Sequence, residues 1–292
     1  MQADDIRKVC VVGAGNMGHQ ISMLAAVSGY AVGCVDTDLL QLEKAEKFAA
    51  TYLPGRVAKG KMTEEQAAAI RGKLSFTDSL EEASRDADFA IEAVTEKLDL
   101  KVSIFKKLDQ FMPPHAIITT NSSFFVSSLL AGETGRPEKV CNMHFFNPAL
   151  AMKCVEIVKG PHTADETAQV TMDFSRRLGK KPVLLNKEIY GFLVNRILAA
   201  IHNEALYLLE MGVASAEDID SAVVNALGHP LGPFRLMDLT GIDLTYHITM
   251  ERYQASGQAE DKPSPTIVEK YVKGEWGQKS GKGFYSYETM QD

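Results

Sequence analysis

A short apolar run followed by three regularly spaced glycines restricts the fold of this chain more than any other feature. Residues 9–12 have the continuous hydrophobic character of a buried parallel strand and lead directly into Gly13-Ala14-Gly15-Asn16-Met17-Gly18. An amphipathic helix is predicted from there to about residue 28, and a second strand over residues 31–35 ends at Asp36. This strand–glycine loop–helix–strand–acid unit predicts an α/β domain of the Rossmann type.

The glycine spacing also predicts a ligand. The first glycine permits the tight turn, the second lets the backbone approach a pyrophosphate, and the third lets the helix pack on the strand. The pyrophosphate would lie at the helix N-terminus, where free N–H groups and the helix dipole favour an anion. We therefore expect a dinucleotide to contact Gly13, Gly15, Asn16, Met17 and Gly18.

The acid at the end of the second strand indicates which dinucleotide is bound. A carboxylate at Asp36 would accept hydrogen bonds from a ribose 2′-hydroxyl and would repel a 2′-phosphate. The following residues, Thr37-Asp38-Leu39, offer no arginine or lysine for that phosphate. The pattern favours NAD over NADP.

Further strands and helices complete the predicted first domain. Strands are expected at residues 88–94, 116–120, 139–143, 154–158 and 182–185, and helices at 37–72 (with a break at Pro54-Gly55), 98–111 and 163–179. Ligands bind beyond the carboxyl ends of parallel strands, so polar side chains there should converge on the cofactor: Glu96, Lys101, Ser123 and His144. Ser123 is equally a candidate for an ordinary helix cap.

One histidine stands out near the end of a predicted strand. His144 lies in Met143-His144-Phe145-Phe146-Asn147-Pro148, and an antiparallel return of the next strand would bring Glu156 beside it. A carboxylate that fixes the tautomer of a histidine and raises its basicity is what a general base needs. A lone histidine among apolar residues is more often a buried core residue, so this motif alone leaves both interpretations open.

Basic residues gather after the predicted break at Pro54-Gly55, namely Arg56, Lys59 and Lys61. They form either a solvated helical face or a binding site for a phosphorylated ligand on an otherwise acidic protein. The segment by itself favours neither.

The character of the chain changes after residue 186, which predicts two domains, 1–186 and 187–292. Helices are expected at residues 192–211, 216–227, 234–253 and 266–273, so the second domain should be all-helical. Asn195 is polar in an otherwise apolar first turn. It is either a cap or solvent-facing residue, or a side chain directed at the cleft between the domains.

Composition excludes several classes of protein. A formal charge of −7 argues against a general nucleic-acid binder. The four cysteines show no CxxC pairing and lie in strand-like runs, which predicts core residues in a reducing compartment and no metal site. The start has no secretory profile and no apolar run is long enough to span a bilayer. A cytoplasmic protein without a membrane partner is therefore expected.

Together these motifs resemble the 3-hydroxyacyl-CoA dehydrogenase family, and most closely its short bacterial 3-hydroxybutyryl-CoA dehydrogenases. The resemblance covers essentially the whole chain. Besides the glycine loop and the His-Phe-Phe-Asn-Pro element it includes Glu92-Ala93-Val94, Asn121-Ser122-Ser123, Gly191-Phe192-Leu193-Val194-Asn195-Arg196, His229-Pro230-Leu231-Gly232-Pro233 and Lys279-Ser280-Gly281-Lys282-Gly283-Phe284-Tyr285.

The resemblance implies a role for each candidate residue. His144 would be the general acid/base of an NAD-dependent reaction on a 3-hydroxyacyl-CoA, with Glu156 as its paired carboxylate. The substrate oxygens would be held by Ser123 and Asn195. Further cofactor contacts would fall on Asp36, Glu96, Lys101, Asn121 and Asn147. Coenzyme A is a polyanion, so the resemblance also makes Arg56, Lys59 and Lys61 candidates for its phosphates, and it implies a homodimer through the helical domain.

Two positions depart from the family pattern. Phe124 replaces the polar residue that usually follows the substrate serine, and Tyr190 stands where a smaller residue or proline is common. The change at Phe124 leaves the acyl chain length open, and nothing in the sequence explains the change at Tyr190. The direction of the reaction in the cell is also not indicated by the sequence. Two other functions are compatible with the fold: a dehydrogenase of a free small hydroxy acid, and a non-catalytic structural protein that binds NAD.

Overall fold

The computed structural model describes residues 1–287, which form two compact units. The first unit is Met1–Leu193 and the second begins at Val194. Residues 187–193, which the sequence prediction assigned to the helical domain, lie in the first unit. Each unit has its own hydrophobic core.

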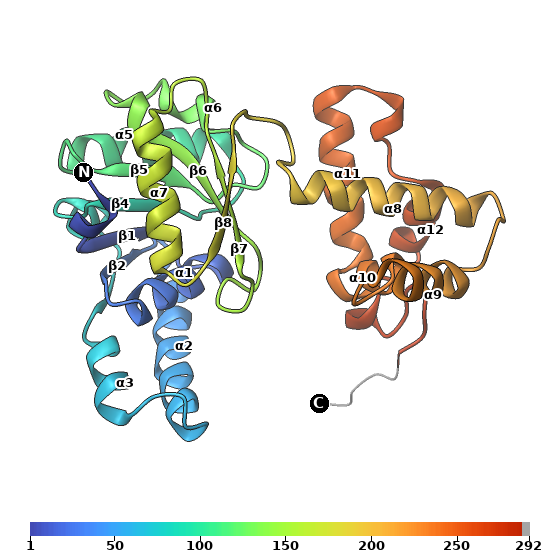
Figure 1. The fold of residues 1–292 in the computed structure, drawn as a ribbon, viewed down its shortest axis with the longest axis horizontal. Coiled ribbons are helices and arrows are strands. Elements are labelled where there is room, and N and C mark those ends of the chain that lie inside the picture. The colour runs from blue at the N-terminus through green and yellow to red at the C-terminus, as the bar shows by residue number, and fades with distance from the viewer. Residues whose placement is uncertain (288–292) are drawn as a thin grey trace. The chain divides into compact units, whose positions relative to one another are not determined.

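The first unit is built on one eight-stranded sheet with the order β3-β2-β1-β4-β5-β6-β7-β8 (Figure 1). The strands are β1 Lys8–Val12, β2 Ala31–Val35, β3 Leu74–Thr77, β4 Phe89–Glu92, β5 Ile117–Thr120, β6 Val140–Phe145, β7 Cys154–Val158 and β8 Lys181–Leu185. All neighbouring pairs are parallel except β6 and β7, which are antiparallel. The Rossmann-type prediction is confirmed, although β3 was not predicted.

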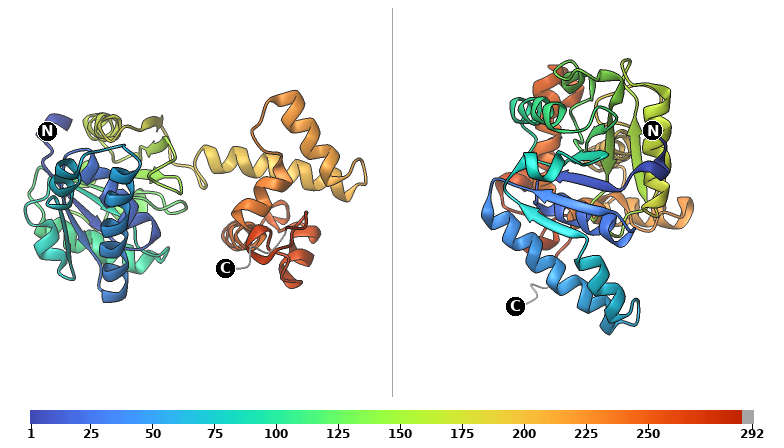
Figure 2. Two further views of the ribbon diagram at one scale, coloured as in Figure 1. Left: turned by 90° about the horizontal axis from the view of Figure 1, so that it is seen from below. Right: turned by 90° about the vertical axis from the view of Figure 1, so that its left-hand side faces the viewer.

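Helices cover both faces of the sheet (Figures 1 and 2). They are α1 Asn16–Val27, α2 Leu39–Ala58, α3 Glu64–Arg71, α4 Leu80–Ser84, α5 Leu98–Phe111, α6 Ser128–Ala131 and α7 Asp165–Arg177. Alternate residues of β1 point to opposite faces. Val9 and Val11 pack with α1 and α7, whereas Cys10 and Val12 pack with α4, α5 and α6. The central strands are therefore apolar on both sides, as a doubly covered parallel sheet requires.

The helices α2 and α3 project from the body of the first unit as a pair (Figure 1). The predicted helix break at Pro54-Gly55 is wrong, because α2 continues through Pro54 to Ala58. Proline removes one helical N–H, and the carbonyl that loses this donor belongs to Ala50, an exposed residue in the last part of the helix. The interruption comes later, where Thr63 caps α3 and forms a capping box with Gln66.

The second unit is helical, with α8 Val194–Glu210, α9 Ala216–Leu227, α10 Pro233–Thr240, α11 Ile242–Ser256 and α12 Pro265–Val272. Its core includes Phe234, Met237 and Ile242. The single helix predicted over residues 234–253 is wrong, because Gly241 adopts a φ of 106° and separates α10 from α11. Only glycine adopts this conformation readily.

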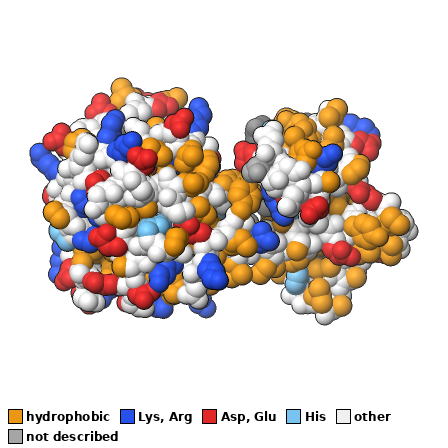
Figure 3. Space-filling view, turned by 90° about the horizontal axis from the view of Figure 1, so that it is seen from above, with side chains coloured by type: hydrophobic (Ala, Val, Ile, Leu, Met, Phe, Trp, Pro, Cys, Tyr) orange, Lys and Arg blue, Asp and Glu red, His pale blue; other side chains and the backbone are white. Residues whose placement is uncertain are grey.

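The surface of the second unit carries several large apolar side chains (Figure 3). They include Tyr207, Met211, Val213, Leu227 and Val272, and the last of these is 78% exposed. The four cysteines of the chain are free, and three of them are buried. Among the described residues no helix is both long and apolar enough to cross a membrane.

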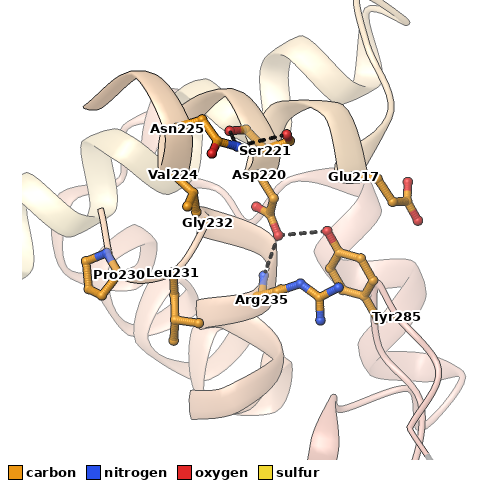
Figure 4. Close-up of a pocket in the computed structure, with 10 residues that line it drawn as sticks. All are labelled: Glu217, Asp220, Ser221, Val224, Asn225, Pro230, Leu231, Gly232, Arg235 and Tyr285. Carbon is orange, nitrogen blue, oxygen red and sulfur yellow. Dashed lines mark hydrogen bonds between the residues drawn. The ribbon is translucent and has the colours of Figure 1, made fainter. Parts of the chain in front are cut away.

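Two buried carboxylates hold the last described residues of the second unit. Asp220 accepts hydrogen bonds from the N–H groups of Phe234 and Arg235 and from the hydroxyl of Tyr285. Figure 4 shows the bonds to Arg235 and Tyr285. Asp238 accepts from the N–H groups of Phe284 and Tyr285. The hollow around Asp220 is therefore explained by helix capping, because Asp220 binds the first N–H groups of α10. The Gly-Lys-Gly-Phe-Tyr motif is explained by its attachment to Asp220 and Asp238.

Candidate active site

The glycine loop has the form that a pyrophosphate site needs. Gly13 adopts a φ of 103°, and a Cβ atom there would lie 2.6 Å from the carbonyl oxygen of Ala93. A Cβ atom on Gly18 would lie 1.7 Å from the carbonyl oxygen of Gly13. A Cβ atom on Gly15 would meet nothing within 4 Å, so the space above this residue is open to a ligand. Gly15 makes no side-chain cap, which leaves the first N–H groups of α1 for an anion.

Asp36 follows β2 at the same edge of the sheet and is fixed by the loop itself. Its Oδ2 accepts a hydrogen bond from the N–H of Ala14 at 2.8 Å, and its Oδ1 accepts from the N–H of Asp38 at 3.0 Å. The carboxylate is therefore held beside the glycine loop, where the ribose of a dinucleotide lies in this fold. The glycine loop and Asp36 fit NAD.

His144 and Glu156 are direct partners across β6 and β7, as the sequence predicted. The imidazole Nδ1 lies 2.8 Å from Glu156 Oε2, and the two residues are 3% and 0% exposed. An ionised carboxylate only accepts hydrogen bonds, so Nδ1 carries the proton and donates it. This tautomer leaves Nε2 as an acceptor, and Nε2 lies 3.0 Å from Ser123 Oγ.

Aromatic rings surround this histidine. The ring of Phe146 lies 4.7 Å from the imidazole between centroids, and that of Phe192 lies 5.5 Å away. Phe192 is fully buried and has a φ of 48°, a conformation that a bulky residue adopts only when its surroundings enforce it. The next residue, Leu193, donates its N–H to Glu156 Oε1 at 3.0 Å.

Glu96 holds the loop that presents Ser123. Its Oε1 accepts from the N–H of Ser123 at 2.9 Å, and both carboxylate oxygens accept from Ser122 Oγ. Lys101 is fully buried and reaches Glu96 Oε2 at 3.2 Å and Glu92 Oε1 at 2.7 Å. Direct cofactor contacts by Glu96 and Lys101 stay predictions, whereas their contacts to the serine loop and to each other are part of the fold.

Glu92 is a buried carboxylate near the serine loop whose pairing the sequence did not lead us to predict. It is fully buried in β4, and its Oε2 accepts a hydrogen bond from the hydroxyl of Thr120 at 2.6 Å. The signal in the sequence was a glutamate inside an apolar strand with a lysine nine positions later. A buried carboxylate requires such a partner, so the pairing of Glu92 with Lys101 was open to inference.

Two asparagines expected to contact the cofactor lie at the same edge of the sheet. Asn147 Oδ1 accepts a hydrogen bond from Asn16 Nδ2 at 3.1 Å, which joins the segment after His144 to the start of α1. Asn121 Oδ1 accepts from the N–H of Phe145 at 2.9 Å and so ties the end of β5 to the end of β6. The structure thus brings most of the predicted cofactor residues together.

Other predicted residues lie elsewhere. Asn195 is in the first turn of α8, in the second unit, so its role toward the substrate stays a prediction. Arg56 lies near the end of α2, while Lys59 and Lys61 follow in the exposed turn before α3. The Nε atom of Arg56 is buried without a hydrogen-bond partner among the described residues. Within residues 1–287 no cluster of His, Cys, Asp and Glu has the makings of a metal site.

Comparison with known proteins agrees with this geometry. Residues 8–189 match the family model for the 3-hydroxyacyl-CoA dehydrogenase NAD binding domain, and residues 191–287 match the model for the C-terminal domain of the same family. A probable 3-hydroxybutyryl-CoA dehydrogenase of Bacillus subtilis is 38% identical over 97% of this chain and 98% of its own length. The pig mitochondrial hydroxyacyl-coenzyme A dehydrogenase is 37% identical over 97% of this chain and 91% of its own.

A solved structure shows the same arrangement of elements. The (S)-3-hydroxybutyryl-CoA dehydrogenase of Ralstonia eutropha superposes with a TM-score of 0.89 at 35% sequence identity. The match covers 97% of this chain and all of the other. The likeness therefore extends over both units and is not confined to the dinucleotide-binding part.

Proposed function

The chain belongs to the 3-hydroxyacyl-CoA dehydrogenase family, and we propose that it interconverts (S)-3-hydroxyacyl-CoA and 3-oxoacyl-CoA with NAD, with 3-hydroxybutyryl-CoA as the expected substrate. The observation that carries this proposal is the chain of contacts from Glu156 through His144 to Ser123, with distances of 2.8 and 3.0 Å. It ends in a basic nitrogen and a hydroxyl at the edge of the sheet that carries the glycine loop.

In the oxidative direction the proton and the hydride leave the substrate separately. His144 Nε2 takes the proton of the 3-hydroxyl group. NAD, held by the glycine loop and Asp36, would supply the acceptor for the hydride that leaves C3. Glu156 stabilises the imidazolium that forms, because its Oε2 already accepts the hydrogen bond from Nδ1. Ser123 Oγ holds the substrate oxygen beside Nε2, and we assign Asn195 as the second group on the substrate. In the reverse direction His144 returns the proton to the 3-oxo oxygen.

Burial of the pair supports this role over a structural one. His144 and Glu156 are almost fully removed from water, so the electrostatic interaction between the carboxylate and the imidazolium is weakly screened. A non-catalytic protein of this fold has no need of a buried carboxylate aimed at a histidine whose other nitrogen faces a serine.

We assign the coenzyme A phosphates to Arg56, Lys59 and Lys61. Lys59 and Lys61 are exposed, and the Arg56 side chain, near the end of α2, is partly exposed. The formal charge of the whole chain is −7, so this local group of cations would act as the attracting site for a polyanion. A charge-removing variant of all three residues should raise the KM for the thioester without changing the KM for NADH.

We also propose a homodimer through the second unit, whose exposed apolar side chains support an interface between copies (Figure 3). Sedimentation at micromolar concentration tests this, and a monomer-sized species would refute it. A cytoplasmic location stays a prediction.

The decisive test of the activity is NADH oxidation with acetoacetyl-CoA, run beside free acetoacetate and beside NADPH. Turnover with the thioester and NADH alone is expected. Turnover with free acetoacetate would favour a hydroxy-acid dehydrogenase, and NADH binding without turnover of any thioester would favour the structural alternative.

A further inference from the structure

Two aromatic residues on segments that carry active-site contacts, Phe124 and Tyr190, are in contact with each other. The rings of Phe124 and Tyr190 lie 5.7 Å apart between centroids, at an interplanar angle of 36°. We propose that this ring pair forms a wall beside the reaction centre that restricts the substrate to short acyl chains. The inference rests on the proposed function and specifies the substrate class of the same site.

Phe124 is held against the reaction centre by its backbone. It directly follows Ser123, whose Oγ lies 3.0 Å from His144 Nε2. The hydroxyl of Ser122 accepts hydrogen bonds from the N–H groups of Phe124 and Phe125, at 3.2 and 2.8 Å. Ser122 is itself buried and bound to Glu96. The turn that carries the Phe124 ring is therefore fixed, and the ring cannot withdraw by a backbone movement without displacing Ser123.

Tyr190 is fixed in the same way by the segment after β8, residues 186–193, which we name the strap. Before Tyr190, Glu188 Oε1 accepts from Ser127 Oγ at 2.9 Å and from the N–H of Ser128 at 2.8 Å. After it, the Phe192 ring lies on His144 and the Leu193 N–H binds Glu156. The strap is thus anchored on both sides of the tyrosine.

Burial differs between neighbouring residues of this strap. Glu188 and Tyr190 are partly buried and Phe192 is fully buried, whereas Ile189 is 44% exposed and Leu193 is 43% exposed. The chain turns at Gly191 and Phe192, where φ is 74° and 48°. Tyr190 lies just before this turn, between the residue that binds the serine loop and the residue that packs on the imidazole.

These contacts limit the space around C3 of the substrate. The oxygen on C3 must lie within hydrogen-bonding distance of both His144 Nε2 and Ser123 Oγ, which places C3 close to the backbone that leads into Phe124. The rings of Phe146 and Phe192 already pack on the imidazole. A small group on C3 fits beside this cluster, but a long chain would have to displace the Phe124–Tyr190 pair.

The test is the dependence of kcat/KM on acyl length, measured with 3-oxoacyl-CoA thioesters of four, six, eight and ten carbons and NADH. Wild-type protein should prefer four carbons. Phe124→Ala and Tyr190→Ala should each raise the ten-carbon to four-carbon ratio of kcat/KM by about tenfold or more, because an apolar pocket gains with each methylene it accommodates. Tyr190→Phe keeps the ring and should keep the wild-type ratio. Ile189→Ala shortens an exposed neighbour on the same strap and should also leave it unchanged.

The outcomes separate this inference from the proposed function. No turnover of any thioester by wild-type protein would refute the proposed function. If the wild type turns over thioesters but neither alanine variant changes the ten-carbon to four-carbon ratio of kcat/KM, the ring wall is refuted and the proposed function is not. A wild-type preference for the ten-carbon thioester would also refute the ring wall. The KM for NADH serves as the check on folding, since a variant that retains it has an intact first unit.

Discussion

The backbone N–H of Leu193 donates a hydrogen bond to Glu156 Oε1, on the carboxylate whose Oε2 accepts from His144. Both oxygens of a fully buried glutamate are therefore engaged, and one of the donors comes from the strap. The orientation of the carboxylate, and with it the tautomer of the histidine, depends on the positive φ of Phe192 that directs this N–H. The strap is part of the candidate active site.

Replacement of Phe192 by leucine tests this dependence. The smaller side chain leaves the imidazole without the ring that packs on it and allows the strained backbone to relax, which moves the Leu193 N–H. We expect kcat with acetoacetyl-CoA to fall by about ten- to a hundredfold, since small misplacements of catalytic groups have effects of this size. The KM for NADH should not change. A Phe192→Leu enzyme with wild-type kcat would show that the ring has no positioning role.

The proposed acid/base pair predicts unequal effects of two amide substitutions. His144→Gln removes the group that transfers the proton and should lower kcat by about 10²–10⁴-fold. Glu156→Gln keeps a hydrogen-bond acceptor for Nδ1 but removes the charge that stabilises the imidazolium, so a smaller loss is expected. His115→Gln, at a histidine with a 51% exposed side chain, is the matched control. Stopped-flow measurement of NADH consumption distinguishes the three variants.

Asp36 should determine the preference for NADH over NADPH. Asp36→Ala removes both the charge that repels a 2′-phosphate and the acceptor that fixes the Ala14 N–H, so the KM for NADH should rise and the discrimination against NADPH should fall. Asp36→Asn retains an acceptor oxygen and separates the two effects. Steady-state kinetics with both cofactors gives the ratio, and an unchanged ratio in both variants would contradict the assignment.

His202 should make the second unit sensitive to acid. Burial lowers the pKa of His202 from 6.5 to about 4, and its Nε2 has no hydrogen-bond partner among the described residues. Between these two values the unfolded chain binds a proton that the folded chain does not, so the free energy of unfolding falls as pH falls. The effect of this one group reaches about 3 kcal/mol at the lower end of the window. Urea unfolding at pH 7.5 and 5.0 measures how much free energy of unfolding is lost on acidification, and this loss should be smaller for His202→Leu than for the wild type. Equal losses of free energy in the two proteins would contradict the lowered pKa of His202.

The attachment of the C-terminal motif through Asp238 should be a large contribution to stability. Asp238→Ala leaves the N–H groups of Phe284 and Tyr285 and the hydroxyl of Tyr287 without their acceptor. Three partly buried donors left without an acceptor are expected to lower the free energy of unfolding by about 3 kcal/mol. Glu251→Ala, at an exposed position of α11, is the control and should change it little. Thermal unfolding followed by circular dichroism measures both.

The errors in the predicted elements have local physical causes. Pro54 predicts a helix break, but one missing N–H near the exposed end of a helix does not stop the helix. Gly241 lies inside an apolar periodic run that predicts one helix, although its φ of 106° separates two helices. The edge strand β3, Leu74–Thr77, is too short to show a clear alternation of apolar and polar residues.

Short-range patterns in the sequence are enough to predict several parts of the site. The glycine loop, the acid after β2 and the antiparallel pairing of His144 with Glu156 follow from residue spacing and strand direction. Which distant residues support them is visible only in the folded chain. The burial of Lys101 against Glu92, the turn at Phe192 and the contact of Phe124 with Tyr190 join segments whose meeting depends on packing, and packing is a property of the whole fold.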